Sequence, residues 1–322
     1  MVADLSSSKV PIRLATRSSP LALRQVELVA AALAAARAAA PAAPGATVAQ
    51  SPVTPVALET SGDLRPDVPI AAIGGRGVFV REVDEAVLAG RADASVHSAK
   101  DLPSSIPDSL VIAAYLARAD PRDALVGSPL SALAPAAVVA SGSVRRRAQL
   151  AWLRPDLRFV ELRGNIATRL AKVPAGGAVV VAMAALERLA LSGSAASVLS
   201  TTEMLPQIGQ GAIAVCCRPD DIEVVAALEA IDHAPTRAAV ESERAWLRAV
   251  GGGCEAPVGA YGRCLDDGRL HLEAMIASLD GHVLVREAMT GSEPDELGRA
   301  LAARLLDECG GRSLLEQAGV RT

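Results

Sequence analysis

The sequence predicts an α/β protein whose sheets are covered by helices, followed by a small C-terminal α+β domain. Short β-branched runs alternate with longer helical patterns up to residue 231. From residue 258 the pattern changes to three strand-like runs separated by Asp-Gly turns. The chain has 322 residues, enough for two or three domains that each bury a core.

In the α/β part, the chain is expected to pass between two lobes at two places. The expected strands are Ile12–Thr16, Val53–Glu59, Ala94–His97, Leu110–Leu116, Val138–Ser141, Arg158–Leu162 and Ala178–Ala182. The expected helices are Pro20–Arg37, Val78–Ala89, Val144–Trp152, Ile166–Lys172, Ala184–Leu189, Ile222–Ile231 and Pro235–Val250. Turn signals at Asp120–Asp123 and at Leu205–Gly211 mark points where the chain could pass between two lobes and return.

The tail predicts a three-stranded meander and one helix. The strand-like runs are Val258–Leu265, Leu270–Leu279 and His282–Thr290, with hairpin turns at Asp267-Gly268 and Asp280-Gly281. A final helix is expected over Pro294–Cys309.

Composition and charge exclude several classes of protein. The net charge of −4 argues against a general nucleic-acid binder, which needs a broad basic face. The five cysteines match no zinc spacing, so no metal site is expected. A disulfide framework is not expected in a chain of this size, so we expect reduced thiols in a cytoplasmic protein. Residues 1–9 lack the apolar segment of a secretory signal. The uncharged stretches Ala38–Leu58 and Ala124–Val144 contain prolines that argue against a membrane span.

Arginines stand where expected strands end and helices begin. They are Arg17 before Ser18-Ser19-Pro20, Arg145 and Arg146 after Ser143, and Arg163 and Arg169 around Gly164-Asn165. Helix N-termini attract anions, the arginine fork suits carboxylates, and strand ends face the ligand crevice of open α/β sheets. Between residues 141 and 172, seven arginines and one lysine stand against two acidic residues, so the positive charge is local. The alternative is a solvated helix face, which we expect for Arg147, Arg154 and Arg158.

A polar turn, His97–Pro103, follows another expected strand. Its carboxylate, Asp101, could stabilise a positive charge that forms during a reaction, but an ordinary aspartate turn fits the residues equally well. His97 by itself indicates a hydrogen-bonded structural histidine rather than a base.

The cysteines and a glycine loop leave further alternatives open. Cys254 in Gly251–Cys254 could be an exposed attachment site or nucleophile, although the residues alone favour a small buried thiol. Cys216-Cys217 is expected to be structural. Gly74–Gly77 resembles a phosphate loop but lacks the full GxxxxGK[ST] spacing.

Taken together, the motifs resemble the hydroxymethylbilane synthase family, also called porphobilinogen deaminase. The similarity extends from Arg13–Leu21 to the final helix. Its most specific segments are VHSAKDLP (Val96–Pro103), DPRD (Asp120–Asp123), LRGNIATRL (Leu162–Leu170), GQGA (Gly209–Ala212) and GGCEAPV (Gly252–Val258).

The resemblance implies an activity, a cofactor and a fold. Four porphobilinogen molecules would condense to hydroxymethylbilane with loss of four ammonias, in porphyrin and haem biosynthesis. A dipyrromethane cofactor would be joined through a thioether to Cys254, which reverses the interpretation of that thiol as buried. The fold would have two lobes like periplasmic binding proteins, with mixed sheets, and a C-terminal α+β domain. The implied domains are 1–118 with 211–231, 119–210, and 232–322, in a monomer.

The resemblance also implies roles for individual residues. Asp101 would hold pyrrole N–H groups and stabilise the cationic azafulvene left when ammonia departs. The implied cofactor-binding residues are Cys254, Ser98, Lys100, Asp101, Ser143, Arg145, Arg146 and Arg169. The implied substrate-binding residues are Arg17, Ser19, Arg76, Phe79, Arg163, Arg169 and Arg188.

Three positions depart from the family pattern. Arg76 stands where many members have lysine, Ala72 replaces a further lysine, and Gly142 replaces a hydroxyl residue. Two other functions remain possible from the residues: a non-catalytic two-lobed carboxylate-binding module, and a different transferase acting on a phosphorylated substrate. The first does not need Cys254, and the missing phosphate loop weighs against the second.

Overall fold

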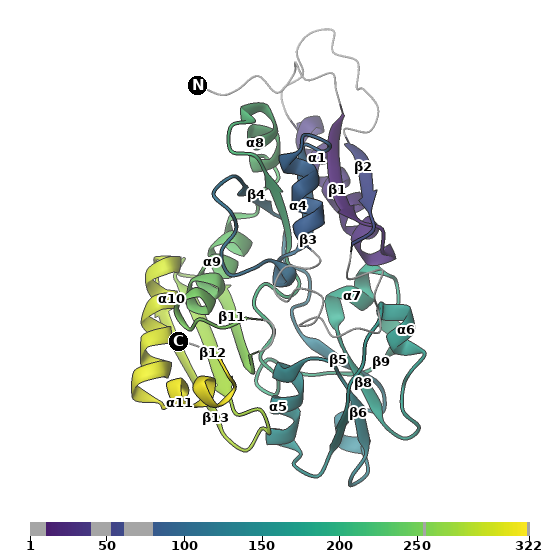
Figure 1. The fold of residues 1–322 in the computed structure, drawn as a ribbon, viewed down its shortest axis with the longest axis vertical. Coiled ribbons are helices and arrows are strands. Elements are labelled where there is room, and N and C mark those ends of the chain that lie inside the picture. Colours follow the sequence, from purple (N-terminus) through teal and green to yellow (C-terminus); the bar gives the residue numbers. More distant parts are fainter. Residues whose placement is uncertain (1–10, 40–52, 61–79, 254–255, 321–322) are drawn as a thin grey trace. The chain divides into compact units, whose positions relative to one another are not determined.

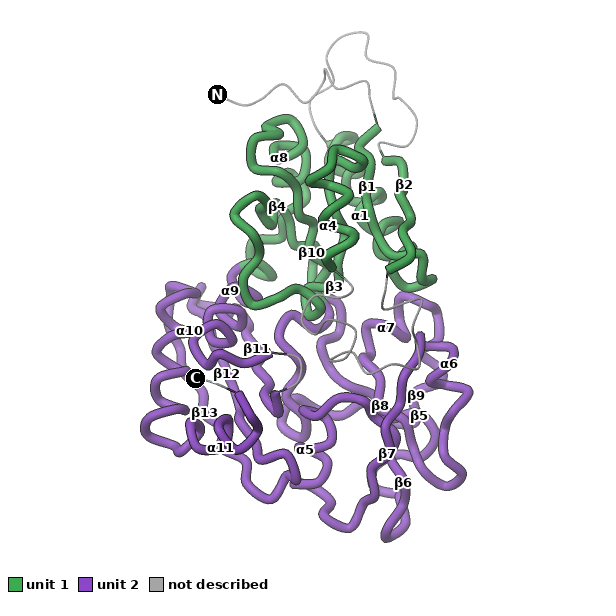
Figure 2. The backbone as a smooth tube through the Cα atoms, viewed as in Figure 1, with its two compact units in different colours: residues 1–118, 212–237 green, residues 119–211, 238–322 purple. Residues whose placement is uncertain are grey.

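The computed structural model describes residues 11–39, 53–60, 80–253 and 256–320. The chain forms two compact units, coloured separately in Figure 2. Unit 1 comprises Met1–Arg118 and Ala212–Arg237, and unit 2 comprises Ala119–Gly211 and Ala238–Thr322. The expected division into three domains stays a prediction. None of the helices in the described part of the chain is long and apolar enough to span a bilayer.

Unit 1 is built on a five-stranded mixed sheet with the order β2-β1-β3-β10-β4. The strands are β1 (Ile12–Arg17), β2 (Val53–Leu58), β3 (Ala94–Ser98), β4 (Val111–Tyr115) and β10 (Ile213–Cys217). β1 runs parallel to β2 and β3, whereas β10 is antiparallel to both β3 and β4. Pro55 is tolerated because β2 lies at the edge of the sheet.

Helices cover both faces of this sheet (Figure 1). α1 (Pro20–Ala39) and α8 (Ile222–Glu229) pack in one apolar cluster with β1, β3 and β10. α4 (Arg81–Leu88) packs against Ala15 in a second cluster. α1 begins where the sequence predicts, because the Ser19 hydroxyl accepts a hydrogen bond from the Ala22 N–H at 3.4 Å.

Unit 2 contains a second five-stranded sheet with the order β7-β6-β8-β5-β9. The strands are β5 (Asp123–Gly127), β6 (Val138–Ala140), β7 (Arg158–Val160), β8 (Ala178–Ala182) and β9 (Ala195–Val198). β6 runs parallel to β7 and β8, and β5 is antiparallel to β8 and β9. The arrangement of directions is therefore the same as in unit 1.

Helices cover this sheet on both faces as well. α5 (Val144–Leu153) packs on one face through Leu150, together with Leu125 and Val180. α6 (Ile166–Leu170) and α7 (Met183–Arg188) pack on the other face, with Ala124 and Val181. The neighbouring residues of β5 thus point to opposite clusters, as a strand buried on both faces requires.

The C-terminal part of unit 2 is an antiparallel meander covered by helices (Figure 1). It consists of β11 (Val258–Cys264), β12 (Leu270–Ala277) and β13 (Leu284–Gly291), with α10 (Pro294–Ala303), α11 (Gly311–Gln317) and most of α9 (Ala234–Ala249), whose first four residues are assigned to unit 1. The even-numbered residues of β12 face the helices, and Met275 and Ala277 pack against Ala148 of α5. α5 therefore lies between this sheet and the five-stranded sheet of unit 2.

Most expected elements are confirmed within a few residues, with two exceptions. β5, β9 and β10 were not among the expected strands; β5 and β10 begin at or just after segments that were interpreted as turns. The helix expected over Pro294–Cys309 is confirmed as α10 continued by a π-helical turn over Arg304–Glu308, but α11 was not predicted; Gly310, with a left-handed φ of 80°, separates the two helices.

Candidate active site

The predicted site residues that the structure describes follow the carboxyl ends of parallel strands. In unit 1, β1 ends at Arg17, and β3 leads into Asp101. In unit 2, β6 precedes Arg145 and Arg146; Arg163 and Arg169 follow β7, and Arg188 follows β8. Each sheet therefore gathers its polar groups at the edge where α/β proteins bind ligands.

Unit 1 has a pocket at this edge that contains both a cation and an anion. Its lining includes Arg17, Ser19, Gln25, His97, Ser98 and Asp101. The Ser98 hydroxyl accepts a hydrogen bond of 2.7 Å from the Gln25 amide of α1, which links the end of β3 to the helix. Ser98 and Ser19 thus share the pocket with Arg17 and Asp101, as their predicted roles require, whereas Lys100 is half-buried in the same turn without lining the pocket.

Asp101 lies in a single 3₁₀ turn, Ala99–Asp101, directly after β3. The turn is held by the Ala99 N–H, which donates to the Ala212 carbonyl at 3.0 Å. The Asp101 side chain is half-buried, and no other described residue forms a hydrogen bond or ion pair with its carboxylate. It therefore differs from a turn aspartate that caps its own backbone.

His97 is structural, as predicted. Its Nε2 lies 2.8 Å from an oxygen of Asp84, and the Ser95 hydroxyl donates to the same oxygen at 2.8 Å. His97 and Asp84 are both almost fully buried. This triad of side chains ties β3 to α4 and anchors the strand that leads into Asp101.

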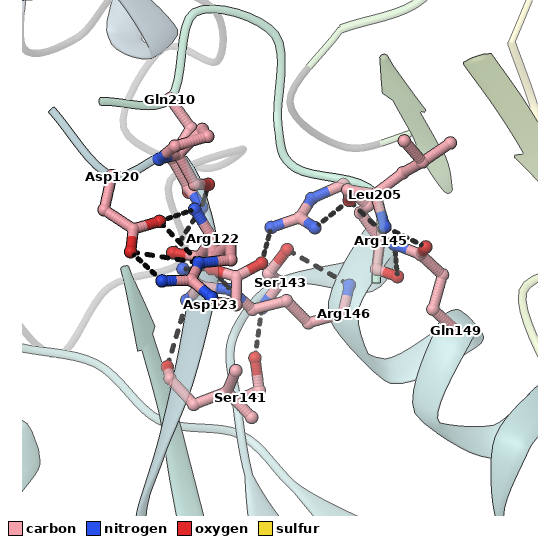
Figure 3. Close-up of polar contacts among 12 residues, drawn as sticks. Asp120, Arg122, Asp123, Ser141, Ser143, Arg145, Arg146, Gln149, Leu205 and Gln210 are labelled. Atoms are coloured by element: carbon pink, nitrogen blue, oxygen red, sulfur yellow. Dashed lines mark hydrogen bonds and ion pairs between the residues drawn. The ribbon is translucent and has the colours of Figure 1, made fainter. Parts of the chain in front are cut away.

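Unit 2 contains a buried cluster of two arginines around one aspartate (Figure 3). Nη2 of Arg145 lies 2.8 Å from Oδ2 of Asp123. Nη2 and Nε of Arg146 lie 2.7 and 3.1 Å from the other oxygen. The Gln210 amide donates to that same oxygen at 2.9 Å. Both arginines are almost fully buried, and Asp123 has no exposed surface.

The arginines decide the ionisation of Asp123. Burial alone would raise the pKa of this carboxyl, but the charges of Arg145 and Arg146 and their hydrogen bonds lower it far below its usual range. The carboxylate is therefore ionised at neutral pH. Two guanidinium groups around one carboxylate leave an excess of one positive charge in a buried place.

Arg145 also contacts the segment between β9 and β10. It donates to the Leu205 carbonyl, which in addition accepts from Gln149 of α5 at 3.1 Å. Gly259 of β11 lies so close that a Cβ atom there would approach Cδ of Arg145 to 3.3 Å and the Pro206 carbonyl oxygen to 2.9 Å. Glycine at this position therefore allows β11, the strand that follows Cys254 in the sequence, to pack beside Arg145.

The remaining arginines of unit 2 are less enclosed. Arg163 forms an ion pair of 2.9 Å with Glu161, and Nε of Arg169 donates to the Gly164 carbonyl at 2.8 Å. Nη2 of Arg188 donates to the Gly211 carbonyl at 2.7 Å, and burial lowers the pKa of Arg188 to about 10. Ser143 caps α5, since its hydroxyl accepts from the Arg146 N–H at 3.5 Å.

The helix-face interpretation of three other arginines was only partly right. Arg154 ends α5 and forms a two-point ion pair with Asp156, and Arg158 lies in β7 rather than on a helix. Arg147 is half-buried on α5.

Some predicted residues fall outside the described part of the chain: Ala72, Arg76, Phe79 and Cys254. The other four cysteines are free thiols. Cys216 and Cys217 are fully buried, and burial raises the pKa of Cys217 to about 11, so they are structural as expected. Within the described ranges, no group of three or more His, Cys, Asp or Glu side chains could hold a metal ion.

Asp123 and Gln210 are the residues that the sequence analysis missed. Both lie in segments that were noted as turn signals and as family motifs, DPRD and GQGA, but neither residue was given a role in the site. The role of Asp123 could have been inferred from its position directly before the apolar run Ala124–Val126. A buried strand rarely begins with an unpaired carboxylate, so this position predicts a cationic partner.

The structure fits a ligand with several carboxylates. The arginine cluster carries an excess positive charge, and among the described residues no hydrogen-bond partner exists for the buried Nε atoms of Arg145 and Arg188. Arg145 lies in the first turn of α5 and Arg188 is the last residue of α7; guanidinium donors of this kind suit acetate and propionate side chains such as those of a dipyrromethane.

Comparison with known proteins identifies the family on both parts of the chain. Residues 12–226 match the family described as "Porphobilinogen deaminase, dipyromethane cofactor binding domain". Residues 237–307 match "Porphobilinogen deaminase, C-terminal domain".

Full-length relatives agree. Porphobilinogen deaminase of Roseiflexus sp. (strain RS-1) is 46% identical over 314 residues, which cover 95% of this chain and 99% of the relative. The protein of the same name from Rubrobacter xylanophilus is 45% identical, covering 91% of this chain and 93% of its own. The protein of the same name from Xanthomonas euvesicatoria is 44% identical, covering 95% of this chain and 99% of its own. The alternative of a non-catalytic binding module is not favoured, and the chain belongs to the porphobilinogen deaminase (hydroxymethylbilane synthase) family of transferases, with the dipyrromethane cofactor-binding domain of that family, as its motifs predicted.

Proposed function

We propose that this chain condenses four porphobilinogen molecules to hydroxymethylbilane, with Asp101 as its catalytic residue and Cys254 as the thioether attachment site of the cofactor. The observation that carries this proposal is the pocket of unit 1, which brings Arg17 and Asp101 together at the end of two parallel strands. A substrate that has carboxylates and develops a positive charge needs one group of each sign.

The chemistry explains why the anion is needed. The C–N bond of the substrate's aminomethyl group breaks, and the nitrogen leaves as ammonia. The substrate carbon then carries positive charge until a new C–C bond forms to a pyrrole carbon and a proton is lost. The Asp101 carboxylate accepts hydrogen bonds from pyrrole N–H groups and stabilises this positive charge. In a partly enclosed pocket, a carboxylate interacts with the cationic substrate more strongly than water does. After four additions, the C–C bond that joins the first added ring to the primer would break; a proton from water would return to the primer's pyrrole carbon, and the hydroxyl of water would add to the freed carbon of the product.

The arginines serve the carboxylates of the substrate and the cofactor. Ser98, Lys100, Ser143, Arg145, Arg146 and Arg169 are proposed to hold the cofactor, and Arg17, Ser19, Arg76, Phe79, Arg163, Arg169 and Arg188 the substrate. When bound, the dipyrromethane supplies the pyrrole carbon to which the first substrate is joined. The close packing of Gly259 beside Arg145 supports a cofactor tethered five residues earlier in the chain, at Cys254.

The mass of the peptide that contains Cys254 tests the tether. The full chain, produced in a host that cannot make porphobilinogen, is incubated with porphobilinogen and then digested. We expect a mass increase of two pyrrole units on the peptide that contains Cys254, none in Cys254→Ser, and a normal increase in the control Cys264→Ser, since Cys264 is an exposed thiol. A wild-type Cys254 peptide that stays unmodified while the protein is folded would refute the tether.

We propose further that the protein works as a cytoplasmic monomer. The free thiols of the described cysteines support a reducing compartment, and the monomer rests on the family resemblance. Sedimentation of the purified protein at micromolar concentration tests the oligomeric state, and a dimer mass there would contradict it.

A further inference from the structure

We infer that Asp123 is a positioning residue: it holds the guanidinium groups of Arg145 and Arg146 in the orientation that receives a carboxylate of the cofactor. The inference rests on the proposed role of these arginines. In this role Asp123 would not contact the ligand itself. It would fix the positions of the two arginine side chains that bind the ligand (Figure 3).

The backbone of Asp123 is fixed by the sheet. As the first residue of β5 it is paired with Ala182 of β8, and its carbonyl accepts from the Leu199 N–H at 2.8 Å. The carboxylate therefore starts from a rigid position at the carboxyl edge of β8. Its orientation is set by Gln210, whose amide donates both to Oδ1 at 2.9 Å and to the Pro121 carbonyl at 2.7 Å.

The two oxygens of Asp123 are divided between the two arginines. Oδ1 accepts from Arg146 and Oδ2 from Arg145. Arg146 is further held by its bond of 3.0 Å to the Val180 carbonyl, and Arg145 by its bond to Leu205. Each guanidinium has five N–H donors, so both retain donors beyond those that Asp123 occupies.

Charge explains why an aspartate is needed here. Two adjacent buried guanidinium groups repel each other, and one carboxylate between them removes most of that repulsion while leaving one positive charge for a ligand. The long arginine side chains are also ordered before the ligand arrives, so less conformational entropy is lost on binding. Without the carboxylate, we expect Arg145 to lose its position, since the amide of an asparagine would present a donor to its Nη2.

Cofactor loading of Asp123→Asn tests the inference, and Asp120→Asn is a matched control. Asp120 lies three residues earlier in the same motif, and its carboxylate pairs with Arg122 instead of Arg145 or Arg146. Each apoprotein is first checked for folding by circular dichroism. The rate of mass gain at Cys254 is then measured over a range of porphobilinogen concentrations.

We expect Asp123→Asn to load about tenfold more slowly, with a higher half-saturating porphobilinogen concentration, because charge-assisted bonds orient the arginines. Asp120→Asn should load like the wild type. A purely structural role would reduce the folded fraction without changing the half-saturating concentration. A folded Asp123→Asn that loads like the wild type overturns the inference.

Gln210→Leu decides the question if Asp123→Asn does not fold. It keeps both ion pairs but removes the amide that orients the carboxylate, so loading should slow about two- to threefold; an unchanged rate overturns the inference. If the wild type itself gains no mass, the proposed tether is wrong and the inference falls with it. A wild type that loads beside an equally fast Asp123→Asn overturns the role of Asp123 alone.

Discussion

The five-stranded sheets of the two units have the same strand order and the same directions, yet they carry different charges at equivalent places. In each sheet, three parallel strands are followed by one antiparallel strand that enters after a crossing of the chain, β10 in unit 1 and β5 in unit 2. β10 begins with Ile213, which is paired with Ser98, whereas β5 begins with Asp123, which is paired with Ala182.

This position is one part of the difference in charge between the two sheets. In unit 1 an apolar residue occupies it, and the anion of the site, Asp101, lies instead in the turn after β3, where it shares a pocket with Arg17. In unit 2 the aspartate is buried and engaged by two arginines, and the net charge left at the edge is positive. The same topology therefore presents an available anion in one unit and a cationic pair in the other, which are the two requirements of a reaction on a charged polycarboxylate.

The largest effect is expected from the anion of unit 1. Asp101→Asn should lower turnover about 100- to 1000-fold, because it removes the charge that stabilises the cationic substrate. Folding and the mass of the bound cofactor should stay detectable. Asp108→Asn, an exposed carboxylate in the same connection between β3 and β4, is the control and should keep wild-type turnover. Turnover of Asp101→Asn near the wild-type value would remove the proposed role of the anion.

The next effect concerns the cationic pair of unit 2. Arg145→Leu should lower the free energy of unfolding by about 2 kcal/mol, since a buried carboxylate loses one of its two ion pairs. It should also block cofactor loading or early elongation. Urea unfolding and intact mass measure the two effects, with Arg147→Leu on the same helix as control. Equal behaviour of the two variants would mean that the ion pair with Asp123 has no special role.

A smaller effect is expected when Arg17, the cation in the pocket of unit 1, is replaced. Arg17→Gln should raise the KM for porphobilinogen about tenfold, because a neutral amide replaces a charged carboxylate partner. The stability should change little. Arg24→Gln, on the exposed face of α1, is the control, since Arg24 pairs with Glu27. Steady-state kinetics that show an unchanged KM for Arg17→Gln would contradict substrate binding by this residue.

The smallest effect is a difference in acid stability between the wild type and Asp123→Asn. The pKa of Asp123 is lowered in the folded state, so its contribution is present above the unfolded pKa and lost as the pH falls towards the folded value. Below about pH 4, the wild type should lose up to about 1.4 kcal/mol per pH unit that the asparagine variant does not lose. Urea unfolding at pH 5 and pH 3 measures this. Parallel losses in both proteins would show that folding does not lower the pKa of Asp123.

Much of the site was predictable because its residues lie in local motifs. Ser19 and Pro20 start α1, the arginines stand at strand ends, and the turn after β3 carries Asp101. Each of these depends on a few neighbouring residues. His97 was also predictable as structural, although its partner Asp84 was not, because the two belong to different elements, β3 and α4.

The sequence by itself determined the α/β class, the family through its ordered motifs, and the placement of arginines and Asp101 at the ends of strands. Only the tertiary structure decided what these side chains meet. Asp123 pairs with Arg145 and Arg146 because β5 inserts antiparallel beside β8, and Gln210, 87 residues away, reaches the same carboxylate. Local propensity depends on neighbours in sequence, whereas an ion pair depends on which strands are adjacent and in what register, and that is settled when the whole sheet packs.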